Sequence, residues 1–218
     1  GNQGTLNFKG GTIIGHERTG IWIEPGTLNM SDNAAIIANS CWGNGGGVEL
    51  ESGTFKMTGG TISYNMASNG GGGVFCANQN TTLQLLGGSI TGNVAQKFGG
   101  GVFSPGSTST FEISGNISIT DNEKGDGTDN NVWLRDGAKI SITGALSDGA
   151  QIGITMNTPG VFTSSSTVSN NDASKFSSDN NDYSVFKNAD EQLYLGTSYT
   201  VTFKVVNGSW DDETTTDK

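Results

Sequence analysis

One short pattern recurs along this chain, and its recurrence constrains the fold more than any other feature. Residues Gly59–Ala67 (GGTISYNMA) return as Gly87–Ala95 (GGSITGNVA), and each copy precedes a glycine run and a short apolar segment. Self-similarity at a steady spacing is the signature of a solenoid, in which each repeat stacks on its own copies. We therefore expect long repetitive faces rather than one deep pocket.

Three apolar registers extend the repeat along most of the chain. The first contains the pairs Leu6/Phe8, Leu28/Met30, Phe55/Met57, Leu83/Leu85, Phe111/Ile113 and Ile140/Ile142, at steps of 22, 27, 28, 28 and 29 residues. The second contains Ile13, Ile36, Ile62, Ile90 and Ile119. The third contains Ile21/Ile23, Val48/Leu50, Val74/Cys76, Val102/Ser104 and Val132/Leu134. Apolar residues two apart indicate strands, so we predict an all-β solenoid, a parallel β-helix with three short strands per coil.

The composition suits such a coil, because each turn buries only a narrow stack of side chains. Only 33% of the 218 residues are hydrophobic, and 35 are glycine. The glycine runs at Gly45–Gly47, Gly70–Gly73 and Gly99–Gly101 all precede the third strand. They indicate one corner that recurs from coil to coil, where a positive φ favours glycine.

The charge excludes one class of partner. The formal net charge is −10 and only two residues, Arg18 and Arg135, are arginine, whereas nucleic-acid binding needs basic surfaces. No stretch approaches the ~20 apolar residues of a membrane span, so we expect no membrane insertion. The sequence begins within a repeat at Gly4 and is rich in Thr, Asn, Ser and Gly. We interpret it as an extracellular fragment of a larger exported bacterial surface protein.

The chain is expected to contain three parts. Residues 1–160 form the parallel β-helix, and the Ser/Asn/Asp-rich residues 161–197 form a cap with late strands, because an open solenoid end needs a polar cover. Residues 198–218 begin a following small β domain, since the alternating segment Tyr199–Val206 runs into the hairpin signal Asn207-Gly208.

The unit Gly-Gly-Thr/Ser-Ile-x-x-Asn, at Gly59–Asn65 and Gly87–Asn93, resembles the repeats of polymorphic outer-membrane proteins. It is similar also to β-helix repeats in large surface proteins of Gram-positive gut bacteria, where a tail like Tyr199–Trp210 would open a domain of the internalin B-repeat type. It departs from the outer-membrane pattern, which favours Phe where this chain has Ile62, Ile90 and Ile119. The resemblance covers nearly the whole chain. It implies a right-handed parallel β-helix, export, and an adhesin-like or stalk role with no enzymatic site.

An asparagine recurs at one corner of the coils. The ladder consists of Asn39, Asn65, Asn93 and Asn122, with His16 at the same position in the first unit. Asparagine tolerates the left-handed conformation, and its amide can bond the amides above and below. We expect a structural ladder; the alternative is a polar ligand groove.

The two cysteines occupy different positions of the repeat. Cys41 replaces the alanines Ala67 and Ala95, whereas Cys76 belongs to the third strand. We therefore predict two free, buried thiols and no disulfide.

One residue per coil should point outward from the third strand, because side chains alternate along a strand. These residues are Trp22, Glu49, Phe75, Phe103 and Trp133. Such an aromatic row can carry sugar rings or a partner, which makes a glycan-binding module one alternative function. Equally, the segment 161–197, or a corner bearing Trp42 or Phe98, can fold over the row.

Two carboxylates beside this row suggest a second alternative. Glu24 and Glu51 occupy equivalent outward positions on adjacent coils, with Glu49 on the same rung as Glu51. Carboxylates ~5 Å apart are typical of retaining glycoside hydrolases, so a polysaccharide hydrolase or lyase using Glu24/Glu51 remains open. We expect no catalysis, because a convex face should leave both groups ionised.

The remaining features indicate no cofactor and no metal. The oxygen-rich segment Asp121–Asp129 lacks the spacing of an EF-hand loop and is interpreted as a solvated corner, although weak Ca²⁺ binding stays open. The sequence thus predicts a non-catalytic, monomeric β-helix module of a bacterial cell-surface protein, with an adhesin-like or stalk role. Its expected partner is a host or matrix glycan or protein.

Overall fold

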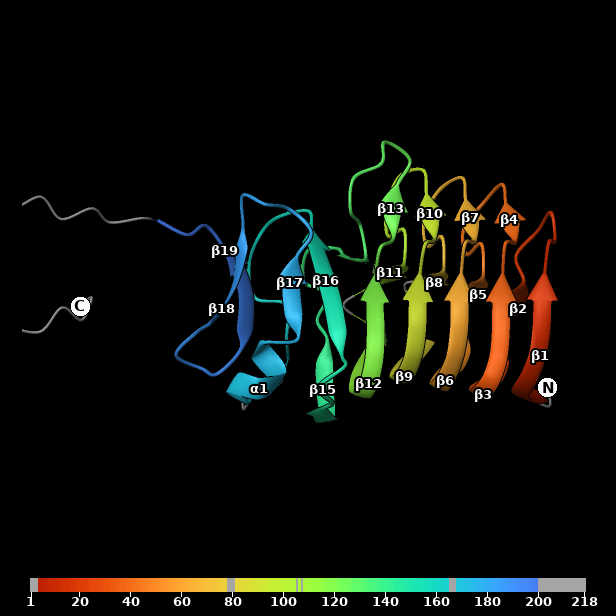
Figure 1. Cartoon of the computed structure of the whole chain (residues 1–218), viewed down its shortest axis with the longest axis horizontal. Helices are drawn as coiled ribbons and strands as arrows, with labels where there is room; N and C mark the ends of the chain where they lie inside the picture. The colour runs from red at the N-terminus through yellow and green to blue at the C-terminus, as the bar shows by residue number, and fades with distance from the viewer. Residues whose placement is uncertain (1–3, 78–80, 105, 107, 165–167, 200–218) are drawn as a thin grey trace, which may run out of the picture.

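The computed structural model describes residues 4–77, 81–104, 106, 108–164 and 168–199. These residues form an all-β fold, in which parallel strands stack into a β-solenoid of about five turns (Figure 1). The described part of the chain contains one helix, the four-residue α1 (Asn170–Ala173). The hairpin expected after Tyr199 lies outside the described residues.

The long strands form one wall of the solenoid. They are β1 (Gly4–Ile14), β3 (Gly26–Ile37), β6 (Gly53–Ser63), β9 (Thr81–Thr91) and β12 (Thr110–Thr120), paired in parallel in this order. Each contains both the first and the second apolar register. The sequence predicted a separate short strand for each register, whereas here the first two share one long strand and glycine pairs such as Gly59-Gly60 lie within it. In β6 they produce a shift of register against β9 between Thr58 and Thr61, with Gly60 at φ 89°.

Two further sets of short strands complete the coils. The three-residue strands are β2 (Ile21–Ile23), β5 (Val48–Leu50), β8 (Val74–Cys76), β11 (Val102–Ser104) and β14 (Val132–Leu134). The two-residue strands β4 (Ser40–Cys41), β7 (Met66–Ala67), β10 (Val94–Ala95) and β13 (Glu123–Lys124) form a separate four-stranded sheet. Strand β16 (Gln151–Met156) pairs with both β12 and β14, so it joins the two walls at one end.

The apolar registers form one continuous core. Ile62 and Ile90 from the long strands, and Val74 and Val102 from the third strands, are all fully buried. Like residues pair across coils, for example Ile62 with Ile90 and Val74 with Val102. The predicted inward register is therefore confirmed.

The glycine runs meet two different needs. Gly71 has φ 66°, as the sequence predicted for a corner. Gly73 does not need a positive φ; a Cβ there would lie 2.6 Å from the Gly101 oxygen and 3.1 Å from Nδ2 of Asn93. The end of each run thus requires glycine because the backbone passes against the asparagine ladder.

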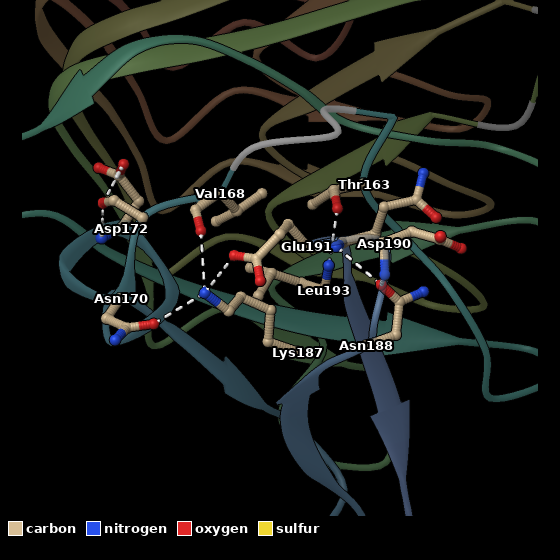
Figure 2. Close-up of polar contacts among 11 residues, drawn as sticks. Thr163, Val168, Asn170, Asp172, Lys187, Asn188, Asp190, Glu191 and Leu193 are labelled. Atoms are coloured by element: carbon tan, nitrogen blue, oxygen red, sulfur yellow. Dashed lines mark hydrogen bonds and ion pairs between the residues drawn. The ribbon is translucent and has the colours of Figure 1, made fainter.

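The C-terminal strands lie beyond β16, at the end of the solenoid away from β1 (Figure 1). They are β17 (Phe176–Ser178), β18 (Ser184–Lys187) and β19 (Leu193–Gly196), whereas β15 (Ser141–Leu146) pairs with β12 beside β16. Figure 2 shows how this segment is held: Nζ of Lys187 donates to the Val168 carbonyl at 3.4 Å and to Oδ1 of Asn170 at 2.9 Å, and it pairs with Glu191. Nearby, the Leu193 amide donates to Thr163 Oγ1 at 2.8 Å. These contacts tie Lys187 of β18 to Val168 and Asn170, and Leu193 of β19 to Thr163.

The cysteines are both free, as predicted, but only Cys76 is buried. The expectation for Cys41 was wrong, since this side chain is partly exposed. Its equivalents Ala67 and Ala95 are buried. Cys41 lies on β4, the edge strand of the four-stranded sheet, and the preceding coil contacts this edge through the Ser40 N–H, which donates to the His16 carbonyl at 2.8 Å, and the Thr19 hydroxyl, which donates to Sγ of Cys41 at 3.5 Å.

Candidate functional site

The asparagine ladder is a buried column of side-chain hydrogen bonds. Oδ1 of each rung accepts both the backbone N–H and the Nδ2–H of the rung before it. For Asn93 these bonds come from Asn65 at 2.9 Å each, and Oδ1 of Asn122 accepts from Asn93 at 3.1 and 2.9 Å. His16 contributes only its backbone N–H, to Oδ1 of Asn39 at 3.1 Å, and its side chain is exposed. The arrangement fits a structural role, because the side-chain amides already form hydrogen bonds with one another and are not free to bind a ligand.

The left-handed residue at this corner is not the asparagine itself. Positive φ occurs one position earlier, at Ala38, Tyr64, Gly92 and Asp121. That expectation from the sequence was therefore wrong in its position. The preceding residue makes the turn, and the asparagine is left to bond along the ladder.

The ladder continues beyond Asn122 and ends on a carboxylate. Oδ1 of Asn131 accepts from Asn122 at 2.9 and 3.0 Å, and Asn131 in turn donates to Asp179 through its backbone N–H and its Nδ2, at 2.7 Å each. The Thr155 hydroxyl also donates to Asp179, at 2.8 Å. Burial raises the pKa of Asp179, and these three donors oppose that rise. Sequence reasoning missed both residues; the only signal was that Asn130-Asn131 stands where earlier coils have a glycine run.

The outward row does not form one open platform. Trp22 is 62% exposed, Glu49 and Phe75 are half-buried, and Phe103 and Trp133 are each only 8% exposed. Phe75, Phe103 and Trp133 stack in parallel with ring centroids 4.9 Å apart. The Phe98 ring lies 4.8 Å from Trp133 and 6.2 Å from Phe103. Of the two corners considered from the sequence, the one bearing Phe98 therefore contacts the row, whereas Trp42 is 91% exposed.

A shallow groove lies beside the covered end of the row, and we call it the corner groove. It has a volume of about 560 Å³. Its walls come from four segments: the corner at Lys97–Phe98, residues 124–133, the end of β16 with Asn157, and residues 179–181. Asp179, which ends the ladder, is one of its lining residues, so the groove adjoins the end of the asparagine ladder.

The carboxylates at the other end of the row differ from each other. Glu24 is exposed and Glu51 is half-buried, and they flank the paired residues Ile23 and Leu50 on adjacent coils. Burial and the neighbouring Glu51 raise the pKa of Glu49 to about 7, although the Thr19 hydroxyl donates to it at 3.3 Å. The carboxyl with the raised pKa is therefore Glu49, which the sequence placed on the same rung as Glu51.

A second exposed feature follows the four-stranded sheet. Trp42, Tyr64 and Met66 are exposed on adjacent coils, at or next to β4 and β7. We call these three residues the apolar ridge. Sequence reasoning did not single out Tyr64 and Met66, because no apolar register marks their positions: Ala38, Gly92 and Asp121 are the equivalents of Tyr64, and Ser40, Val94 and Glu123 are those of Met66.

The oxygen-rich corner is held by its own side chains. Lys124 donates to Asp126 at 2.8 Å, and this bond, with those from Thr128, holds the pKa of Asp126 well below its usual range. Among the residues that the structure describes, no group of three or more His, Cys, Asp or Glu side chains is placed to hold a metal ion. Within the same residues, no helix has the length and apolar character needed to cross a membrane.

Comparisons with known proteins add no relative. No family model, curated protein or solved structure gives a significant match to this chain. Function must therefore be argued from the site itself.

Proposed function

We propose that this chain is a non-catalytic module of a bacterial cell-surface protein, with an adhesin-like or stalk role. In this proposal the solenoid is a right-handed parallel β-helix with three sides per coil, and residues 161–197 cap it. The module is extracellular and monomeric, and it belongs to a larger exported protein. Its partner is a host or matrix component.

The observation that carries the proposal is the apolar ridge. Trp42 is 91% exposed, and Tyr64 and Met66 are also exposed, beside a sheet whose inward side is packed. Large exposed apolar side chains on adjacent coils are typical of a contact surface. The net charge of −10 keeps the rest of the surface hydrophilic. The ridge thus gives a rigid rod an adhesive edge.

The ridge is tested with beads that carry the full chain. We expect the beads to adhere to surfaces coated with mucin or with collagen, and the double variant Trp42→Ser/Tyr64→Ser to adhere much less. The control is Asn33→Ala, which changes an exposed residue on the long-strand wall. Equal adhesion by the double variant and the control would overturn the ridge as the contact surface.

A second candidate function is favoured by one observation, the raised pKa of Glu49 beside Glu51. Glycoside hydrolysis needs one carboxyl kept protonated near neutral pH and a second that stays ionised. Glu49 would be the acid, Glu51 or Glu24 the second group, and the exposed Trp22 a surface for a sugar ring. Reducing-end release from a polysaccharide panel, abolished by Glu49→Gln and retained by Asn33→Ala, would establish this function in place of the first.

A further inference from the structure

The corner groove combines an aromatic surface with a rim of polar side chains. Phe98 is 41% exposed, and its ring is held by contacts with Trp133 and Phe103. Rings fixed in this way lose little freedom on binding, so the contact area that they offer is gained at low entropic cost. This aromatic surface forms one side of the groove.

The polar rim is built from amides, hydroxyls and carboxylates. It consists of Thr128, Asp129, Asn130, Thr155, Asn157, Asp179, Asn180 and Asn181. Asn157, Asn180 and Asn181 are exposed, so their amides can both donate and accept hydrogen bonds. Asp179 is different, because Asn131 and Thr155 already fix its carboxylate. The groove therefore offers exposed amides around a carboxylate whose position is fixed by its own hydrogen bonds.

The charges of the groove are of both signs, so they give no strong attraction to an ionic ligand. Its lining contains two lysines, Lys97 and Lys124, and two aspartates, Asp129 and Asp179, and Asp126 beside the groove pairs with Lys124. A ligand with a net charge gains little long-range attraction from such a mixed set, whereas a neutral ligand rich in hydroxyls can bond the exposed amides of the rim.

We propose that the corner groove binds a neutral saccharide. One face of a pyranose ring is formed by C–H groups and would lie on Phe98, while its hydroxyls exchange hydrogen bonds with the asparagines and aspartates of the rim. The volume of about 560 Å³ falls within the range of about 300–1,000 Å³ found for small-molecule sites. The inference goes beyond the display role, and its site differs from the apolar ridge and from the exposed Trp22 end of the row.

The experiment is an array of neutral hexose and N-acetylhexosamine oligosaccharides, followed by calorimetry on the strongest binder. Because one hydrogen bond contributes about 0.5–1.5 kcal/mol, Asn181→Ala should weaken binding by about 2- to 10-fold, and Phe98→Ala should weaken it by about 10-fold or more. Trp42→Ala and Asn33→Ala are the matched aromatic and amide controls, and both should bind like the natural chain.

Each outcome decides the proposal. Loss with the two groove variants and retention with the two controls supports it. The proposal is overturned if the folded natural chain binds none of the saccharides. It is also overturned if the groove variants and the controls lose binding equally, or if a peptide without glycan binds more tightly and displaces the saccharide. If Phe98→Ala lowers the stability of the fold, the proposal is tested by Asn181→Ala alone, because a change at the exposed Asn181 leaves the packed core intact. Adhesion through the ridge is unaffected by a negative result here, so the two proposals fail separately.

Discussion

Replacing Asn93 by alanine removes a middle rung of the asparagine ladder. The natural side chain is fully buried, accepts two bonds from Asn65, and donates to the Ile62 carbonyl and to Oδ1 of Asn122 at 2.9 Å each. The alanine variant leaves two buried donors of Asn65 without this acceptor. At about 1–3 kcal/mol for each of these two unsatisfied buried donors, we expect the free energy of unfolding to fall by about 2–6 kcal/mol.

The substitution Asn93→Asp separates hydrogen bonding from volume. The ionised aspartate of this variant can still accept from Asn65, but its second oxygen faces the Ile62 carbonyl and Oδ1 of Asn122, which are both acceptors. Burial and these oxygens should raise the pKa of the new carboxyl above its unfolded value of about 3.9. The variant should therefore be closest to the natural chain below about pH 4 and lose stability as the pH rises through its folded pKa.

The assay is urea unfolding followed by circular dichroism and tryptophan fluorescence, at pH 4 and pH 7. Asn33→Ala, at an exposed position, is the control and should change stability by less than about 0.5 kcal/mol. A loss for Asn93→Ala no larger than that of the control would refute the ladder as a stabilising element. So would an Asn93→Asp variant with the same loss at both pH values.

Three further predictions rest on single sites. The pKa of Glu49 is raised to about 7, so its ionisation lowers the stability of the fold as the pH rises from the pKa of the unfolded chain through 7. In a thermal scan, Glu49→Gln should therefore raise Tm at pH 8 and change it little at pH 4. In the native protein, a thiol reagent should modify the partly exposed Cys41 rapidly and the buried Cys76 only on unfolding, and finding fewer than two thiols in denaturant would contradict the free state of both. Val74→Asp should unfold the solenoid by burying an unpaired charge, whereas Val74→Ala should only lower Tm; a folded Val74→Asp variant would contradict the core register.

The sequence predicted those parts of the fold that repeat. The inward positions such as Ile62 and Val102, and the outward order of Phe75, Phe103 and Trp133, follow directly from the spacing of like residues. The prediction of a separate strand for each register failed in the long strands, where one strand contains two registers. A glycine pair can form either a corner or a β-bulge, and the sequence alone does not distinguish these two backbone conformations.

The corner groove and the end of the ladder could not be predicted in this way. Asp179 is 48 residues from its partner Asn131 and belongs to a segment without the repeat. Likewise, the raised pKa of Glu49 depends on its burial and on how close Glu51 and Thr19 come in space. Such contacts follow from where the non-repeating segments fold back, and periodicity carries no information about that.

The ladder also has a consequence for the length of the rod. Within the ladder, each asparagine bonds to the asparagines of the adjacent coils, 28 residues away for Asn65 and Asn93 and 29 for Asn93 and Asn122. A tandem duplication of one such stretch adds a rung with the same orientation, and His16 and Asp179 remain at the two ends. The rod then grows by one strand spacing of ~4.8 Å, because stacked repeats contact only their neighbours. Duplication of one coil in the gene can thus lengthen the solenoid without altering either of its two ends.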